Sequence, residues 1–587
     1  MKLRLVFGLI IFCVITTKAQ YSASPSDSSS LWWKQTTIYQ IYPRSFADSN
    51  NDGIGDLRGI INKLDYINGL GFETIWVSPF YESPQADFGY DISNYYAIAP
   101  EYGTLATVDS LIAETHKRGM KIVFDLVLNH TSDQHPWFKE SASSKTNPKA
   151  NWYVWRDGRG KNGKRPPNNW YNVISQKGWT YSKARGQWYY SAFLNFQPDL
   201  NYRNPDVKAA MFNVVKHWLG SGVDGIRLDI FNCIMEDSLL RDNPKVLTYV
   251  PSAQHLKTKF QNRTNNINHP DNNALARELR DTIDKFTNPP RFMVGEAVGN
   301  VTDNMPLVGK NADGLNLVFL FDMIFYDFKP KFFRNKINLY EQLCPEPLMP
   351  TIVFGNHDNR RSINRIKNNL QKARLLAMFQ LTARGVPVIY YGEEIGMRDV
   401  WMPKKDAKDP ISDMMKAVPQ FMRKKLPVPL NRDVCRTPMQ WDTTSNAGFS
   451  KAKPWLPVYS EADIRNVQTQ LADSLSLLNT YRDLVHLRDS VTTLKCGDII
   501  INNVGKKRKV LSYLRQYKDS EYYVFMNFSK RKVELPDEVR MLFSTIYTLN
   551  TGDNFTNDII TLTPYGGIVL KYQGPKGQSD DLDYKGE

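Results

Sequence analysis

Short apolar runs alternate along the chain with segments that are apolar at every third or fourth position. The runs Phe72–Val77 and Met120–Leu128 are typical of buried strands, whereas the apolar positions of Pro205–Leu219 fall on one helical face. The same alternation predicts helices at 107–117, 273–286 and 370–384, and strands at 223–229, 292–296, 351–355 and 386–391. Apolar strands joined by amphipathic helices indicate a parallel βα architecture. Periodicity alone leaves an open doubly wound sheet and a closed barrel as alternatives.

Two stretches depart from this alternation. Residues 130–201 are rich in Trp, Tyr, Asn, Gly and Lys without helical periodicity, which favours a large loop-rich insertion after a strand. From 489 onward, short alternating runs predict an antiparallel β domain. We therefore expect a βα domain over 35–129 and 202–488, an inserted domain over 130–201, a β domain over 489–575 and a polar tail over 576–587.

The N-terminus has the pattern of a secretory signal peptide. A basic start, MKLR, precedes the apolar run Leu5–Ile15, and the small residues Thr17 and Ala19 precede a cleavage point before Gln20. The run is shorter than the roughly 20 residues that cross a bilayer. We expect a signal peptide over 1–19, a linker over 20–34 and a secreted protein, with an uncleaved anchor as the alternative. Sequons fit a secreted glycoprotein at Asn262, Asn300, Asn527 and Asn554.

The formal net charge of +15 is spread along a 587-residue chain in which basic and acidic residues are interspersed. Because no nucleic-acid-binding motif accompanies the charge, we interpret it as a basic soluble surface and expect no nucleic-acid partner. Of five cysteines, Cys13 lies in the signal peptide. The other four are widely spaced without a CxxC pair, which argues against a zinc site and leaves one or two disulfides possible.

Acidic residues stand at the carboxyl ends of the predicted strands, where the active sites of βα barrels lie. They are Asp125, Asp229, Glu296 and Asp358, with His130 and His357 beside them. Cleavage of a glycoside needs one carboxyl as proton donor and a second facing the anomeric carbon. Arg227 is expected to point the same way as Asp229 and to keep it ionised. The apolar neighbours of Glu296 are expected to raise its pKa.

Four ordered strings carry a resemblance to a known family: DLVLNH (125–130), GIRLDI (225–230), GEA (295–297) and GNHDN (355–359). Together they resemble the motifs of the α-amylase superfamily, glycoside hydrolase family 13. QPDLN (197–201), DFGYDISNY (87–95), YYGEEIGM (390–397) and RTPMQWD (436–442) are similar to its α-glucosidase, oligo-1,6-glucosidase and sucrase branch. The resemblance extends from about Leu31 into the C-terminal domain.

The resemblance implies a (β/α)8 TIM barrel with an inserted domain after strand 3 and a C-terminal β-sandwich. It makes Asp229 the nucleophile, Glu296 the acid/base and Asp358 the stabiliser of the transition state. Positions matching the terminal glucose subsite are Asp87, Tyr90, His130, Phe193, Arg227, His357 and Arg432. Asp125 and Asn129 match largely structural positions, so Asn129 is not expected to carry a glycan despite its sequon.

The loop DSNNDGIGD offers hard oxygen ligands that suit calcium. The candidate ligands are the side chains of Asp48, Asn50, Asp52 and Asp56 and, from the resemblance, the carbonyl of Ile54. The twelfth position, Gly59, excludes an EF-hand, because that motif ends in a bidentate Glu. The alternative is an Asx-Gly turn without an ion. A bound calcium would be structural.

The sequence departs from the family pattern at Ile230-Phe231-Asn232, where relatives often carry a small residue after the nucleophile, and at Asn359, where Gln is common. The first departure leaves linkage preference open. We expect a secreted retaining α-glucosidase acting on small α-glucosides of the maltose and sucrose type. The alternatives are a transglucosidase, an inactive ectodomain with a binding role and an endo-acting amylase; the oligomeric state is left open.

Overall fold

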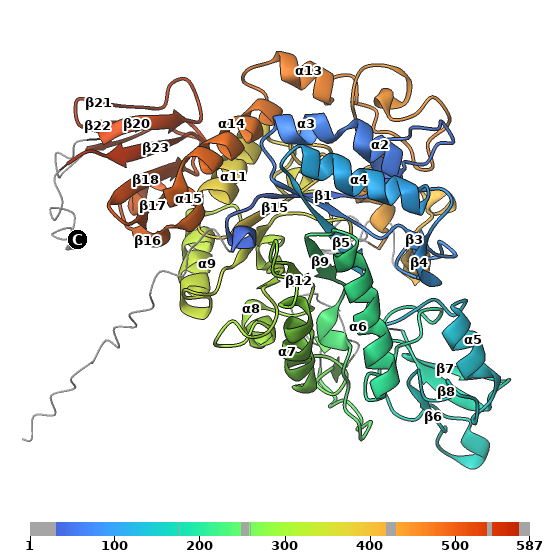
Figure 1. Ribbon diagram of the computed structural model, residues 1–587. Helices are drawn as coiled ribbons and strands as arrows, with labels where there is room; N and C mark the ends of the chain where they lie inside the picture. Colours follow the sequence, from blue (N-terminus) through green and yellow to red (C-terminus); the bar gives the residue numbers. More distant parts are fainter. Residues whose placement is uncertain are drawn as a thin grey trace, which may run out of the picture.

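The computed structural model describes residues 31–574 except 175, 248–256, 259, 418–429 and 537–542. Its centre is an eight-stranded parallel sheet, rolled into a barrel (Figure 1). The strands are β1 (Ile38–Ile41), β2 (Thr74–Val77), β5 (Lys121–Leu126), β9 (Gly225–Leu228), β12 (Phe292–Gly295), β13 (Leu317–Val318), β14 (Thr351–Val353) and β15 (Val386–Tyr390). Strands adjacent in the chain lie side by side, and β1 pairs with the last strand, β15. The barrel, and not the open sheet, is the architecture.

The barrel closes between β13 and β14 through a side chain. Within the described residues these two strands share no backbone ladder. The buried Thr351 hydroxyl instead accepts from the Leu320 amide at 2.9 Å and donates to the Val318 carbonyl at 3.0 Å. A single threonine therefore satisfies backbone groups that a sixth-to-seventh strand ladder would otherwise pair.

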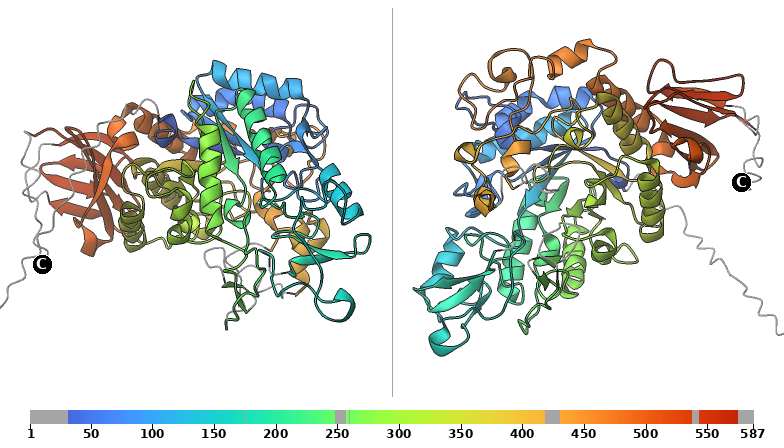
Figure 2. Two further views of the ribbon diagram at one scale, coloured as in Figure 1. Left: turned by 60° about the horizontal axis from the view of Figure 1, so that its bottom comes forward. Right: turned by 180° about the vertical axis from the view of Figure 1, so that it is seen from behind.

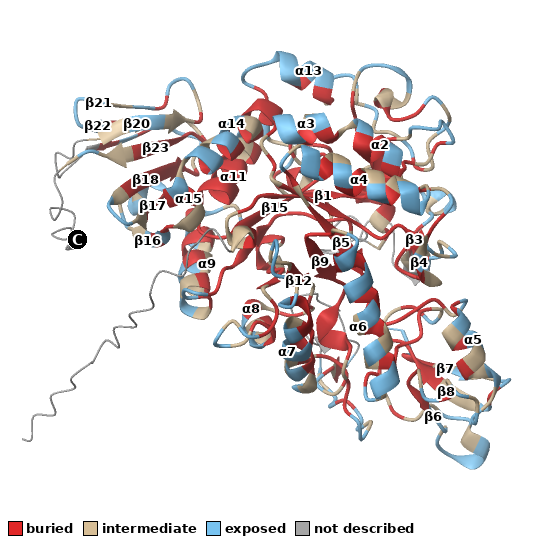
Figure 3. Ribbon diagram, viewed as in Figure 1, coloured by how far each residue is buried: buried red, intermediate tan, exposed pale blue. Residues whose placement is uncertain are grey.

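Alternate side chains of each strand face the barrel interior, as the pleat requires. Trp76, Val123 and Val294 belong to one cluster of buried side chains, whereas Ile75, Ile122 and Met293 belong to the cluster that packs against the helices. Burial is therefore continuous along the strands, and the helices are exposed along their outer stripes (Figure 3). The same parity places residues 125, 227, 229 and 296 inward at the carboxyl ends of β5, β9 and β12.

Helices follow most of the strands and surround the barrel (Figures 1 and 2). The longer ones are α4 (Leu105–Lys117), α6 (Pro205–Gly220), α7 (Asp271–Ile283), α9 (Pro330–Leu343), α11 (Leu370–Thr382) and α14 (Leu477–Ser490). Side chains that cap the first turn mark where two of these helices begin. Thr104 caps α4 in a capping box with Thr107, and Asn204 followed by Pro205 begins α6.

Two further units lie at opposite ends of the molecule (Figure 1). The insertion carries α5 (Pro136–Ser143) and a sheet of β6 (Trp155–Arg156), β8 (Gln187–Tyr190) and β7 (Trp179–Ser182), in that order. The C-terminal unit has one sheet of β16 (Asp498–Asn502), β17 (Val510–Tyr517), β18 (Ser520–Asn527), β23 (Gly567–Tyr572) and β20 (Phe543–Thr548). Its second sheet is β19 (Val533–Pro536), β22 (Ile559–Leu562) and β21 (Asn554–Thr556).

The two C-terminal sheets enclose a core of their own. Tyr523, Phe525 and Leu570 of the first sheet share a buried cluster with Leu535 and Ile560 of the second. This arrangement is a β-sandwich, as the family resemblance implied.

Some expectations were wrong or incomplete. Asn527 is fully buried and its amide nitrogen donates to the carbonyls of Arg531 and Thr563, so this sequon is not an accessible glycan acceptor. All four described cysteines are free thiols, so the possible disulfides do not form.

The sequence pattern did not predict strand β13, because a strand of two residues shows no periodicity. The predicted signal peptide and polar tail lie outside the described residues. Within the described part of the chain, no helix has the length and apolar character needed to cross a membrane.

Candidate active site

The predicted carboxylates meet at the carboxyl ends of the barrel strands. Asp229 directly follows β9 and its amide donates to the Leu126 carbonyl, while Glu296 follows β12 and its amide donates to Leu228. Asp358 lies in the loop after β14. Regular strand pairing therefore continues to Asp229 and Glu296, which places their backbones rigidly.

One guanidinium joins three of the acidic groups. Arg227, 1% exposed, donates from Nη1 to Asp125 Oδ1 at 2.6 Å and to Asp229 Oδ1 at 2.9 Å, and its Nη2 contacts Glu296 Oε2. The carboxyls of Asp229 and Glu296 therefore lie on the same guanidinium. The predicted pairing of Arg227 with Asp229 is present, and the same guanidinium also contacts the carboxyl of Glu296.

Burial sets the protonation of this pair. It raises the pKa of Glu296 to about 8, as expected from its apolar neighbours, against the opposing charge of Arg227. Burial also raises the pKa of Asp229 to about 7, so Arg227 only partly offsets desolvation and the expectation of a fully ionised Asp229 was too simple. Burial thus raises both pKa values, so the two adjacent carboxyls titrate as one pair near neutral pH and hold a single proton between them there.

Asp358 has the opposite electrostatic environment. Burial pushes its pKa upward, but His357, Arg432 and Arg436 outweigh burial and hold the pKa well below the usual range. Its Oδ1 accepts from Arg436 Nη2 at 2.8 Å and from Arg432 Nη1 at 3.2 Å. Asp358 is therefore a permanent anion at the side of the proton-sharing pair.

The predicted histidines are neutral, because burial lowers the pKa of His357 to about 3 and that of His130 to about 4. Gln40 Nε2 donates to His357 Nδ1 at 2.8 Å, so the ring proton is on Nε2, 3.3 Å from Asp358 Oδ2. Tyr90 stacks on His357 with ring centres 5.2 Å apart. His130 Nε2 lies 3.1 Å from the Tyr90 carbonyl, and Phe193 lies against His130 at 5.6 Å.

Asp87 and Arg432 form the remaining part of the predicted site. Arg432 Nη2 donates to Asp87 Oδ1 at 2.6 Å, and Gln197 Nε2 from the insertion donates to Asp87 Oδ2 at 3.1 Å. Asp91 holds this loop by accepting from the Asp87 amide at 2.9 Å. The structure therefore brings all ten predicted catalytic and substrate-binding residues into one connected cluster.

Three contributors were missed as site residues. Gln197 and Arg436 stand in quoted motifs, so the motifs contained a signal that was not used. Asp409 lies in an irregular loop without periodicity or motif, and only the fold brings it to Arg432. Asn232, flagged as a departure, is buried and bonds both backbone groups of Val298, so it orders the loop after Glu296.

The candidate calcium ligands form a tight loop. Asp48 accepts from the amides of Asn51 and Gly53, and Asp52 accepts from the Ile54 amide. Asp56 caps α2 (Leu57–Asn62) through the Gly59 amide. Among the described residues no group of three or more His, Cys, Asp or Glu side chains is placed to hold a metal ion. The oxygen donor set fits calcium chemically, whereas the carboxylates are already engaged by the loop's own amides.

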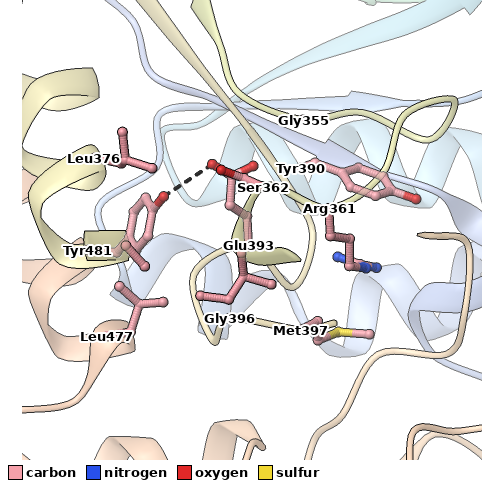
Figure 4. A pocket seen from close by; sticks show the side chains of 12 residues that line it. Gly355, Arg361, Ser362, Leu376, Tyr390, Glu393, Gly396, Met397, Leu477 and Tyr481 are labelled. Atoms are coloured by element: carbon pink, nitrogen blue, oxygen red, sulfur yellow. Dashed lines mark hydrogen bonds between the residues drawn. The ribbon is translucent and has the colours of Figure 1, made fainter. Parts of the chain in front are cut away.

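A small cavity is lined by a different set of side chains (Figure 4). It measures about 20 Å³, room for about one water molecule. Arg361, Glu393, Met397 and Tyr481 line it, and the Tyr481 hydroxyl donates to Glu393 Oε1 at 3.2 Å. None of the ten predicted site residues lines this cavity, so it is not the candidate active site.

Comparison with known proteins agrees with this fold. Residues 40–497 match the model of the alpha amylase catalytic domain. An oligo-1,6-glucosidase of Parageobacillus thermoglucosidasius is 35% identical, with 93% of this chain and 100% of that protein covered. An alpha-glucosidase of Apis mellifera is 34% identical, with coverage of 97% and 99%. A crystal structure of an alpha-glucosyl transfer enzyme, XgtA, superposes with a TM-score of 0.84 at 34% identity, covering 92% of this chain and 99% of that one.

A parallel barrel with three carboxylates at its strand ends and these relatives define a glycoside hydrolase. The chain belongs to the α-amylase family, glycoside hydrolase family 13.

Proposed function

We propose that this enzyme is a retaining α-glucosidase that releases terminal α-linked glucose from disaccharides and short oligosaccharides. The observation that carries the proposal is the guanidinium of Arg227, which contacts the carboxyls of both Asp229 and Glu296 and so holds them side by side. An inverting enzyme needs carboxyls roughly 6.5–9.5 Å apart to admit a water between them. Two carboxyls bridged by one guanidinium suit a nucleophile and its acid/base partner.

The proposed chemistry proceeds by double displacement. Asp229 bonds to the anomeric carbon while the glycosidic bond breaks and the Glu296 proton passes to the leaving oxygen. Glu296 then takes a proton from water, whose oxygen attacks the same carbon and releases Asp229. Asp358, anionic throughout, stabilises the positive charge that develops on the sugar ring. Asp87 and Arg432 bind the hydroxyls of the terminal glucose, with Tyr90, His130, Phe193 and His357 around it.

The substrate class is supported by the relatives, which are named alpha-glucosidase and oligo-1,6-glucosidase. Incubation of the purified protein with maltose, sucrose, isomaltose, trehalose and starch tests it. We expect disaccharides to be cleaved faster than starch and proton NMR to detect α-glucose before mutarotation. Asp229→Asn, a loss of the nucleophile, is expected to remove activity by several orders of magnitude. Initial β-glucose would exclude retention, and a folded variant with more than about a tenth of the activity would exclude Asp229 as nucleophile.

A transglucosidase is the second candidate, because the enzyme whose structure superposes at a TM-score of 0.84 is named for glucosyl transfer. In that reaction a sugar hydroxyl replaces water in the second step. Product analysis with sucrose or maltose at rising concentration separates the two. Two free glucose molecules per maltose bond cleaved, or equal amounts of glucose and fructose from sucrose, support hydrolysis. A growing share of transfer products, with glucose falling below these ratios, supports the alternative.

We also propose secretion after cleavage before Gln20, supported by the signal-peptide pattern of residues 1–19. N-terminal sequencing of protein from the medium of expressing cells tests this.

Calcium is proposed as a structural ion held by Asp48, Asn50, Asp52, Asp56 and the Ile54 carbonyl. When bound, it would neutralise the carboxylates of this loop. We expect calcium to raise the Tm of the chelator-treated wild type and not that of Asp52→Ala. Equal shifts in both proteins, or no shift in either, would contradict this site.

A further inference from the structure

Asp409 is a buried acid next to the candidate glucose subsite that neither the sequence motifs nor the proposed chemistry uses. Its side chain is 0% exposed. It precedes the 3-10 segment η8 (Pro410–Ala417), in the long connection after β15. Arg432 begins another 3-10 segment, η9 (Arg432–Cys435), so the two residues belong to separate arms of this connection.

The Asp409 carboxylate binds the Nε–Nη2 edge of the Arg432 guanidinium. Arg432 Nη2 donates to Asp409 Oδ1 at 2.8 Å, and Nε lies 3.2 Å and 3.1 Å from the two carboxylate oxygens. Asp409 Oδ2 also accepts from the backbone amide of Arg432 at 2.5 Å. Such a two-pronged contact fixes the plane of a guanidinium as well as its position.

The Nη1–Nη2 end of the same guanidinium, which shares Nη2 with the edge bound by Asp409, faces the site. Arg432 Nη2 reaches Asp87 Oδ1 at 2.6 Å and Nη1 reaches Asp358 Oδ1 at 3.2 Å. Because Asp409 binds the Nε–Nη2 edge, the plane of the Arg432 guanidinium is fixed. Only in that orientation do Nη1 and Nη2 also reach Asp358 and Asp87. The position of Asp409 therefore determines where Arg432 meets Asp87.

We propose that Asp409 is a positioning residue of the glucose subsite, holding Arg432 in the plane from which it binds the terminal sugar together with Asp87. The proposal rests on the proposed α-glucosidase function. It predicts an effect mainly on substrate binding, because Asp358 keeps Arg436 at 2.8 Å and His357 at 3.3 Å when Arg432 moves. Without the Asp409 carboxylate, Asp87 keeps its hydrogen bond from Gln197 but loses the oriented guanidinium of Arg432.

The neighbouring Asp433 supplies a matched control. It is also 0% exposed, and its Oδ2 accepts from the amides of Lys408 and Asp409 at 2.6 Å and 2.9 Å. Asp433 thus joins the same two arms through backbone groups. If Asp409 acts only by keeping the loop folded, removal of either carboxylate has the same result. If it positions the guanidinium, the two variants differ.

The test measures kcat and KM for p-nitrophenyl α-glucoside and Tm for the wild type, Asp409→Asn and Asp433→Asn. For Asp409→Asn we expect KM to rise about tenfold or more with kcat within about threefold of wild type, the pattern of lost ground-state binding. We expect KM of Asp433→Asn to stay within about threefold of wild type, although its Tm falls. An unchanged KM in Asp409→Asn, equal KM values in both variants, or a loss confined to kcat would overturn the proposal.

If Asp409→Asn does not fold, Asp409→Glu replaces it, because Glu keeps the charge and displaces the carboxylate by one methylene. A severalfold rise in KM is then expected, and a wild-type KM would overturn the proposal. A wild type that hydrolyses no α-glucoside would instead refute the proposed function. In that case the same variants are compared by the Kd of 1-deoxynojirimycin, a mimic of terminal glucose, with the same expected differences.

Discussion

At the scale of single residues, the site separates three carboxyls by their surroundings. Glu296 and Asp229 are desolvated with one shared cation, and their pKa values rise, whereas Asp358 faces Arg432, Arg436 and a histidine N–H, and its pKa falls. Chemically similar groups thereby acquire different electrostatic environments, which suit the proposed roles of acid/base, nucleophile and permanent anion.

The pKa values of the pair predict a bell-shaped pH profile of kcat/KM. The rate falls as pH drops through about 7, where Asp229 gains a proton, and as pH rises through about 8, where Glu296 loses its own. Glu296→Gln is expected to remove the alkaline limb and most of the rate. The first step, in which Asp229 bonds to the anomeric carbon, needs no proton when the substrate has an excellent leaving group. That step is therefore expected to be much less impaired. Equal damage for good and poor leaving groups would refute Glu296 as the acid.

The same shifts predict opposite stability changes for two variants. The folded-state pKa of Glu296 is raised, so Glu296 increasingly opposes folding as pH rises from its ordinary range near 4.5 through about 8. Glu296→Gln is therefore expected to raise Tm by a few degrees at pH 9 and by less at pH 5. Asp358 has a lowered pKa and stabilises the fold when ionised, so Asp358→Asn is expected to lower Tm across pH 5–9. Thermal melts of both variants at pH 5 and pH 9 measure these changes in Tm. Parallel shifts of the two variants would contradict the opposite pKa shifts of Glu296 and Asp358.

At the scale of elements, one hydroxyl takes the place of a strand ladder. Thr351 of β14 bonds the Leu320 amide and the Val318 carbonyl across the junction with β13. Asp358 follows on the loop after β14, so closure of the barrel and placement of the third carboxylate depend on the same strand.

Thr351→Val keeps the shape of the side chain and removes both hydrogen bonds. Because two buried backbone groups lose their partner, we expect a loss of about 2–4 kcal/mol in the free energy of unfolding. Thr351→Ser keeps the hydroxyl and is the matched control, expected to cost about 1 kcal/mol through its lost methyl group. Chemical denaturation of the three proteins measures the difference. Equal stability of the Val and Ser variants would mean that the hydroxyl does not close the barrel.

At the scale of the whole molecule, the C-terminal sandwich is attached to the barrel by a buried cation. Arg515 of β17 donates to the carbonyls of Thr382 at the end of α11, Leu494 and Gly497. It is 0% exposed, and burial lowers its pKa to about 9. Backbone carbonyls therefore serve as its acceptors, which ties the charge to the junction of the two units.

Arg515→Met fills most of the same volume but leaves these carbonyls without their donor. We expect the Tm to fall by several degrees, since each buried unpaired acceptor costs about 1–3 kcal/mol. Arg374→Met, which removes another barrel-to-sandwich contact from a half-buried position, is the control and is expected to cost less. Differential scanning calorimetry compares them, and a smaller loss in Arg515→Met than in the control would refute the anchoring role.

The sequence by itself determined the βα order, the inward-facing carboxylates and the family motifs. These depend on local periodicity and on the parity of side chains along strands such as Gly225–Leu228, which a linear pattern contains. Tertiary structure decided what local periodicity left open. The pairing of β1 with β15 makes the barrel that the family resemblance implied, and the raised pKa values of Asp229 and Glu296 depend on their desolvation beside Arg227. Asp409 meets Arg432, and Asn527 is buried, through packing between distant segments, which no local pattern encodes.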